Sequence, residues 1–161
     1  MSVDDALVIR TTDPADAPAL ARLLTQMQQE YGAPHPELPA VEADLTQLPT
    51  GVDIFVAERP DGSFVGLAAV ANLYPGPGLS GGFFLKELYV SPQARSSGVG
   101  ESLMRALARA ARDRGFRRID WTVATENAGA LRFYDRLGGA AQTDRFFYRL
   151  GPQALDALAD R

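Results

Sequence analysis

An apolar strand that runs directly into a glycine-containing turn and then into a helix is the feature that most constrains this chain. The strand pattern covers residues 83–90, the turn carries Arg95 and Gly98, and an apolar helical stripe follows from Val99. The first N–H groups of a helix have no partner within it, and the helix dipole adds partial positive charge there. The sequence therefore predicts an anion site of the diphosphate type at this turn.

Two common phosphate-binding loops do not fit this turn. A dinucleotide-binding fingerprint needs a third glycine three residues after the second, and Leu103 stands there instead. A Walker loop ends in Gly-Lys-Ser/Thr, but the lone lysine of the chain, Lys86, lies upstream in the strand. The sequence therefore disfavours both a nicotinamide dinucleotide and a nucleoside triphosphate.

The turn instead resembles the coenzyme-binding motif of the GNAT family of N-acetyltransferases. That motif is Arg/Gln-x-x-Gly-x-Gly/Ala between a strand and a long helix, and Arg95, Gly98 and Gly100 stand at the matching positions. About thirty residues further on, residues 127–138 resemble the second family motif, Asn-x-x-Ala followed by Phe-Tyr and a closing glycine. One departure is Ser96, where many members carry glycine.

The length of 161 residues predicts a single domain, 1–161, which the resemblance implies is an acetyltransferase domain. The predicted strands are 8–10, 52–58, 64–72, 83–90 and 118–123, with a closing hairpin of 140–143 and 146–150. The predicted helices are one that starts near 12–16 and ends before Gly32, and then 41–48, 98–114 and 127–137. With the resemblance, this order implies an α/β fold with a mixed, mostly antiparallel sheet of six to seven strands and helices on both faces. Its parallel strands, 83–90 and 118–123, are expected to splay apart.

Composition excludes several classes of function. The chain has no cysteine, so neither a thiolate metal site nor a cysteinyl acyl-enzyme is expected, and direct transfer between two bound substrates is the default. The single histidine, His35, lies between prolines and cannot build a metal site alone. A net charge of −4 without a basic run argues against nucleic acid. Without a long apolar stretch, we expect no membrane partner and a cytoplasmic location.

The resemblance implies acetyl-CoA as the acetyl donor and no metal. Its pantetheine arm is expected in the gap between the splayed strands, where the main chain of Leu88 and Val90 would hydrogen-bond it and polarise the thioester carbonyl. The positions that the resemblance assigns to the coenzyme are Leu88, Tyr89, Val90, Arg95, Ser96, Ser97, Gly98, Val99, Gly100, Glu101, Asn127, Ala130 and Phe133.

Two side chains are expected to move protons. An amine must lose a proton before it attacks, and Glu87, in the strand beside the gap, is the first candidate base; a salt-bridged strand residue is the alternative. Glu126 is a second candidate, although a carboxylate at a helix start is its simpler role. Tyr134 matches the family tyrosine that protonates the departing thiolate. Asn127 would hold the pantetheine by its amide, cap the helix, or do both.

The acceptor is predicted to be the primary amine of a small molecule. The loop after the first helix and the segment before the coenzyme-binding strand offer aromatic and acidic groups for a cation, namely Tyr31, His35, Glu37 and Tyr74. The strand also looks like that of diamine and polyamine acetyltransferases, but Lys86 replaces one of their acids. Amino acids, aminoglycoside-like amines and monoamines therefore stay open.

Two other functions remain as alternatives. One is a protein N-terminal or lysine acetyltransferase, and the other is an acyl-CoA-binding module without catalysis, against which Tyr134 counts. A homodimer is also possible, because the run Phe146-Phe147-Tyr148 would offer an apolar edge.

Overall fold

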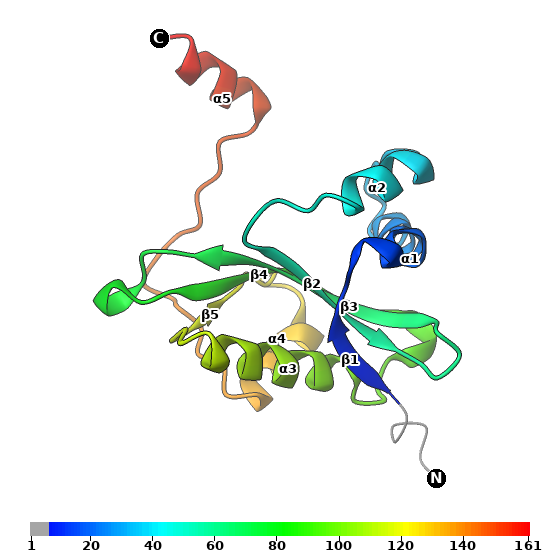
Figure 1. The fold of residues 1–161 in the computed structure, drawn as a ribbon. Coiled ribbons are helices and arrows are strands. Elements are labelled where there is room, and N and C mark those ends of the chain that lie inside the picture. Colours follow the sequence, from blue (N-terminus) through cyan, green and yellow to red (C-terminus); the bar gives the residue numbers. More distant parts are fainter. Residues whose placement is uncertain (1–6) are drawn as a thin grey trace. The chain divides into compact units, whose positions relative to one another are not determined.

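The computed structural model describes residues 7–161, which fall into two compact units (Figure 1). The first unit extends to Thr122, and the second runs from Val123 to Arg161. The elements of the first unit are β1 (Val8–Thr11), η2 (Pro14–Asp16), α1 (Ala17–Glu30), α2 (Leu38–Leu45), β2 (Val52–Glu58), β3 (Phe64–Leu73), η3 (Pro77–Leu79), β4 (Gly82–Val90), η4 (Pro92–Ala94), α3 (Val99–Asp113) and β5 (Ile119–Asp120). The second unit contains α4 (Ala128–Arg136) and α5 (Pro152–Ala159).

The sheet of the first unit is mixed and has the order β1-β2-β3-β4-β5. Strands β1 to β4 pair antiparallel with their neighbours, whereas β4 and β5 are parallel. The register of that parallel pair contains only Phe83 with Ile119 and Phe84 with Asp120. Since β4 continues to Val90, most of its length has no β5 partner within the described residues. The GNAT-like α/β order and the parallel strand pair predicted from the sequence are thus confirmed.

One face of the sheet packs against α1. Leucine and methionine side chains recur at helical spacing along α1 and present one apolar stripe. The core on this face consists of Leu20, Leu23, Met27, Ile54, Val56, Leu67 and Tyr89. Each fully buried leucine contributes about 1.5–3 kcal/mol to folding. This packing brings the C-terminal end of α1 to the end of β4, where Tyr89 lies.

The opposite face packs against α3, and Figure 1 shows α1 and α3 on opposite sides of the sheet. Leu103 and Leu107 are fully buried there. Helix α3 lies very close to β3 at Gly66, because a Cβ added to Gly66 would lie 3.0 Å from Val99 Cγ1 and 3.2 Å from Leu103 Cδ1. Gly115, with φ 73°, follows the last turn, as glycines at helix ends commonly do. The N-terminus of α3 is therefore held firmly next to the end of β4.

Two elements of the first unit differ in extent from their predictions. Helix α2 begins at Leu38 rather than 41 and ends at Leu45 rather than 48. It starts early because Glu37 is extended and Pro39 occupies the first turn, where a missing N–H costs nothing. The strand predicted over 118–123 is reduced to Ile119–Asp120, because its pairing with β4 stops there.

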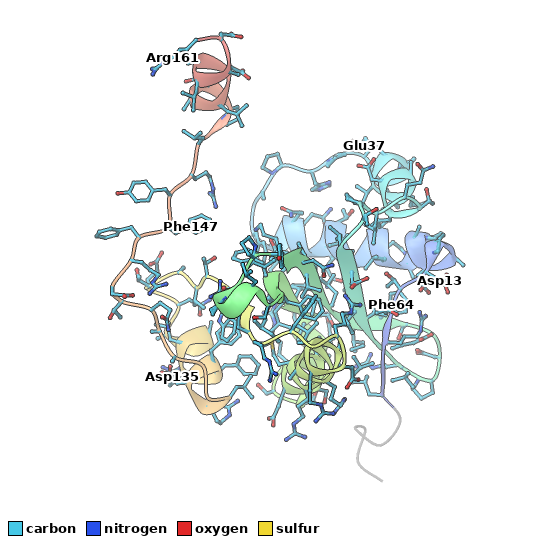
Figure 2. All side chains as sticks on the ribbon, turned by 60° about the vertical axis from the view of Figure 1, so that its left-hand side comes forward. Asp13, Glu37, Phe64, Asp135, Phe147 and Arg161 are labelled. Carbon is cyan, nitrogen blue, oxygen red and sulfur yellow. The ribbon has the colours of Figure 1, made fainter. Side chains whose placement is uncertain are left out.

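The closing hairpin predicted at 140–143 and 146–150 is wrong, since these residues carry no strand, and the described residues form a sheet of five strands rather than six to seven. The segment is extended and leaves Phe146 and Tyr148 86% and 88% exposed. Figure 2 shows Phe147 on the same segment. A two-stranded hairpin with no further strand to pair with is marginal in water, so apolar alternation alone does not create one. Helix α5 follows, with Gly151 as N-cap and a proline in the first turn.

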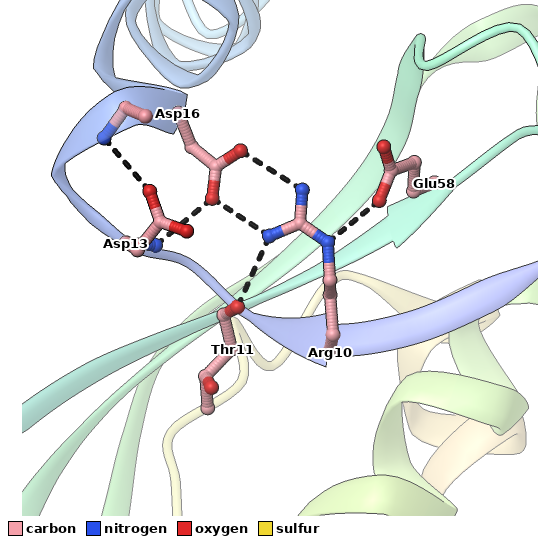
Figure 3. A network of polar contacts seen from close by, with 6 residues as sticks. Arg10, Thr11, Asp13, Asp16 and Glu58 are labelled. Carbon is pink, nitrogen blue, oxygen red and sulfur yellow. Dashed lines mark hydrogen bonds and ion pairs between the residues drawn. The ribbon is translucent and has the colours of Figure 1, made fainter.

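A polar network ties β1 and β2 to the start of α1 (Figure 3). The guanidinium of Arg10 donates two hydrogen bonds to Asp16, of 2.7 and 2.8 Å, and one of 2.6 Å from Nε to Glu58. Asp16 also accepts the Asp13 N–H, while Asp13 accepts that of Ala15, which completes a capping box. The hydrogen bonds from Arg10 hold the pKa of Asp16 below its usual range.

We expect Arg10→Gln to lower the free energy of unfolding by about 1–2 kcal/mol at neutral pH, since it leaves two carboxylates without their cation. The loss should shrink on acidification. Because Asp16 has a lower pKa folded than unfolded, its pairing stabilises the protein above about pH 4 and is lost as the pH falls through the folded pKa. Urea unfolding of both proteins at pH 7 and near pH 3 measures this. An equal difference at both pH values would contradict the assignment.

Candidate active site

The turn between β4 and α3 is built to expose backbone N–H groups. Residue Ser96 has φ 61° and Gly98 has φ 86°, so both are left-handed, and Gly98 is the N-cap of α3. The Ser97 hydroxyl donates to Ala94 O at 2.6 Å and fixes the turn. Within residues 7–161, no side chain caps the N-terminus of α3. The N–H groups of its first turn are therefore available to an anion, which fits a coenzyme diphosphate.

Ser96 explains why glycine is frequent at this position in the resembled motif. A left-handed residue with a Cβ costs about 1–2 kcal/mol, and a β-branched residue costs more. We expect Ser96→Gly to keep stability within about 1 kcal/mol, because relief of strain is offset by unfolded-state entropy. Ser96→Val should destabilise by about 2 kcal/mol and weaken coenzyme binding. Thermal melts and coenzyme titration of the two variants check this, and equal behaviour would contradict it.

The Arg95 side chain, which precedes α3, contacts residues of α1 and β4. Its side chain pairs with Glu30 at the end of α1, its Nε donates to Val90 O at 3.0 Å, and its guanidinium lies over the Tyr89 ring. The Tyr89 hydroxyl donates to the other Glu30 oxygen at 2.8 Å. Hydrogen bonds from Arg95 and then Tyr89 hold the pKa of Glu30 below its usual range. Arg95 thus joins the turn between β4 and α3 to α1.

The Tyr89 hydroxyl is a donor in this network and not an acid. Burial, followed by the hydrogen bond to Glu30, raises the pKa of Tyr89 to about 12. The ring is 2% exposed and belongs to the core under α1. Its side chain is thereby committed to packing and to Glu30, so any contact of Tyr89 with a coenzyme is left to the main chain.

Sequence reasoning missed Glu30. A carboxylate at the C-terminal end of a helix faces the negative end of the helix dipole, so it needs a cation or donors nearby. That signal was present in the chain, because Glu30 ends the predicted helix. Its partner Arg95 lies 65 residues away, and only the fold identifies it.

A β-bulge in β4 sets the direction of Glu87. The register pairs Ala69 with Glu87 and Val70 with Leu85, so Lys86 is the extra residue. Glu87 and Tyr89 share the face that α1 covers, and the bulge interrupts the strand alternation at Lys86. The Glu87 carboxylate is 26% exposed and pairs with Lys86 Nζ at 3.2 Å.

Tyr31, an expected acceptor-binding residue, lies beside the expected base. Its ring meets the Tyr89 ring edge-on, with centroids 6.4 Å apart. Burial and then the negative charges of Glu87 and Glu30 raise the pKa of Tyr31. The structure therefore brings Glu30, Tyr31, Glu87 and Tyr89 into one cluster with Arg95, which we call the β4-end cluster. Two carboxylates beside aromatic rings suit a cationic guest.

The other expected acceptor residues lie outside this cluster. Glu37 is the exposed N-cap of α2, and Tyr74, which follows β3, is 71% exposed. His35 is exposed, and its Nδ1 lies 2.9 Å from Pro36 O. In the described part of the chain, no hydrogen bond or ion pair connects these side chains to Glu87 or Glu30.

The second unit carries the other expected site residues, on α4. Asn127 is the N-cap, and its side-chain oxygen accepts the Ala130 N–H at 3.1 Å, so the capping role is confirmed. Tyr134 packs against the Phe133 ring, with centroids 5.1 Å apart. A backbone hydrogen bond and the Thr125 hydroxyl lower the pKa of Glu126, which makes it a weaker base.

Across residues 7–161, no three His, Asp or Glu side chains are grouped as metal ligands. Nor is any helix of this part of the chain long and apolar enough to cross a membrane.

Comparison with known proteins agrees with the motifs. The model of the Acetyltransferase (GNAT) family matches residues 20–139, which is most of the chain. This chain belongs to the GNAT family of N-acetyltransferases. It is 32% identical to an aminoglycoside N(6')-acetyltransferase type 1 of Stenotrophomonas maltophilia, over 91% of this chain and 94% of that protein.

Two further relatives extend the comparison. The GNAT chain is 33% identical to a thialysine N-epsilon-acetyltransferase of Caenorhabditis elegans, over 47% of this chain and 49% of that protein. It therefore spans about half the length of that relative. Among solved structures, an integron cassette protein from the mobile metagenome of V. cholerae is similar with a TM-score of 0.88 and 27% identity, covering 97% of this chain and 99% of that one.

Proposed function

We propose that this chain is a single-domain, acetyl-CoA-dependent N-acetyltransferase that acetylates the primary amine of a small molecule by direct transfer in a ternary complex. The observation that carries the proposal is the position of the β4-end cluster. An acidic and aromatic site adjoins the anion-binding turn of α3, and Arg95 connects the two. The relatives named for aminoglycoside and thialysine acetylation support an acceptor of this kind.

The donor half of the site consists of the turn and the exposed edge of β4. The N–H groups of the first turn of α3 bind the diphosphate, and the resemblance adds Ser97, Val99 and Glu101 to these contacts. Beyond Phe84, β4 has no β5 partner in the described residues, so main-chain groups of Leu88 and Val90 are offered to the pantetheine. One such N–H stabilises the negative charge that develops on the thioester oxygen.

The proposed reaction also requires proton transfers. Glu87 takes a proton from the ammonium group, directly or through water, and Tyr31 and Glu30 favour the cation. The amine nitrogen then forms a bond to the acetyl carbon while the carbon–sulfur bond breaks. Tyr134 donates its hydroxyl proton to the departing thiolate, and the extra proton left on the acylated nitrogen passes through water to the tyrosinate. With no cysteine in the chain, a cysteinyl acyl-enzyme is not part of this scheme.

A thiol-release assay with an amine panel tests this proposal. Acetyl-CoA is mixed with aminoglycosides, diamines, amino acids, monoamines and amino-terminal peptides, and the cysteine-free chain contributes no thiol background. We expect release with one class of small cationic amines. Release with peptides alone would replace the proposal with a protein acetyltransferase, and coenzyme binding without any release would leave an acyl-CoA-binding module.

We also propose a homodimer that buries the aromatic run Phe146-Phe147-Tyr148. These three side chains are 86%, 64% and 88% exposed, and runs of apolar side chains of this kind usually mark an interaction surface. Light scattering at micromolar concentration should give twice the mass of 17.3 kDa. A monomer mass at that concentration would contradict the dimer.

A further inference from the structure

Arg95 of the β4-end cluster has two possible anionic partners, Glu30 and the coenzyme diphosphate. The resemblance assigns Arg95 to the coenzyme diphosphate, yet in the structure it pairs with Glu30. Both oxygens of Glu30 are engaged, one by Arg95 and the other by the Tyr89 hydroxyl. The single positive charge of Arg95 is offset by Glu30, so it is not available in full to a diphosphate at the N-terminus of α3.

The two contacts of Glu30 differ in how easily they break. Arg95 is 46% exposed on a long, flexible side chain at the start of the turn, and ion pairs of that exposure are weak. Tyr89 is 2% exposed and anchored in the core, so its hydroxyl keeps Glu30 in place whatever Arg95 does. Arg95 can therefore leave while the carboxylate stays, and its departure also gives up the hydrogen bond to Val90 O and the contact with the Tyr89 ring.

We propose that Arg95 exchanges between Glu30 and the coenzyme diphosphate, and that the carboxylate released in this way binds the ammonium group of the acceptor. Glu30 is then an acceptor-binding residue that is masked until the coenzyme is present. The inference rests on the proposed function, and adds to it a residue and an order of events. No covalent bond is made or broken in this step, because one ion pair replaces another.

The surroundings of Glu30 suit the released carboxylate to a cation. The negative charges of Glu87 and Glu30 both act on the Tyr31 hydroxyl, and within residues 7–161 the cations paired with these two carboxylates are Lys86 and Arg95. When Arg95 turns to the diphosphate, the cluster gains one net negative charge. A cationic amine therefore binds more tightly to the coenzyme-loaded protein than to the free protein, and thermodynamic linkage makes the effect reciprocal.

The variant Glu30→Gln tests the exchange, with Glu42→Gln on α2 as the matched control for loss of one carboxylate. Titration with coenzyme A should give binding about two- to fivefold tighter in Glu30→Gln, because Arg95 no longer has a competing partner. The KM for the amine found in the panel should rise about tenfold. Binding of that amine to the unmodified protein should tighten about fivefold when coenzyme A is present, and Glu30→Gln should lose this coupling. Glu42→Gln should match the unmodified protein throughout.

The outcomes separate the two proposals. If the unmodified protein neither binds coenzyme A nor acetylates any amine, the proposed function fails. If the unmodified protein does both, but Glu30→Gln leaves coenzyme affinity unchanged or weakens it together with amine affinity, only the exchange is overturned. A thermal melt of Glu30→Gln within about 2 °C of the unmodified protein confirms that the comparison concerns folded protein.

Discussion

Turnover should fall by about 10² or more when Tyr134 is replaced by phenylalanine, because the departing thiolate loses its proton donor. The ring itself is retained, so its edge-on contact with Phe133 and the packing of α4 should survive. Coenzyme affinity should stay within about twofold, since the hydroxyl acts only as the carbon–sulfur bond breaks. Steady-state thiol release gives kcat, and coenzyme titration gives the affinity.

Tyr148→Phe is the matched control for this variant. It removes a hydroxyl from another tyrosine of the same unit and keeps the aromatic ring that the proposed dimer buries, so it should leave kcat unchanged. Near-normal turnover of Tyr134→Phe would mean that solvent or another group protonates the thiolate, and would remove Tyr134 from the proposed mechanism.

The parts of the fold that the sequence predicted well depend on local signals. The turn Pro60-Asp61-Gly62 lies between two β-branched and aromatic runs, and β2 and β3 are found there with nearly the predicted bounds. Helix α3 is predicted within one residue at each end, because Gly98 and Gly115 mark its limits. The expected site residues at the start of α3, Val99 and Glu101, could be placed from the sequence for the same reason.

Long-range contacts and the pairing of strands at the edge of the sheet could not be predicted from the sequence. Glu30 and Arg95 meet only because α1 crosses the end of β4, and no local pattern encodes that meeting. The bulge at Lys86 depends on the register with β3. Residues 146–150 have the alternation of a strand, but a strand exists only when another strand provides hydrogen bonds, and the described chain does not provide one.

The second large effect concerns the base. Glu87→Gln should lower kcat by about 10², because glutamine cannot accept the proton of the ammonium group, and the part of the pH–rate profile that rises with pH should flatten. The substitution keeps the shape of a side chain that is 26% exposed, so the fold and coenzyme affinity should hold. Rate profiles against pH with saturating acetyl-CoA provide the test.

Lys86→Gln separates catalysis from ion pairing in this experiment. It breaks the 3.2 Å pair with Glu87 but keeps the carboxylate, and it should leave turnover within about threefold, since an exposed ion pair contributes little. If both variants slowed the reaction equally, the ion pair and not the base would be what matters. If neither did, Glu87 would be a salt-bridged strand residue, and the base would have to be sought among water and the remaining carboxylate of the β4-end cluster, Glu30. The pair of variants thus decides between the two roles that the sequence left open for Glu87.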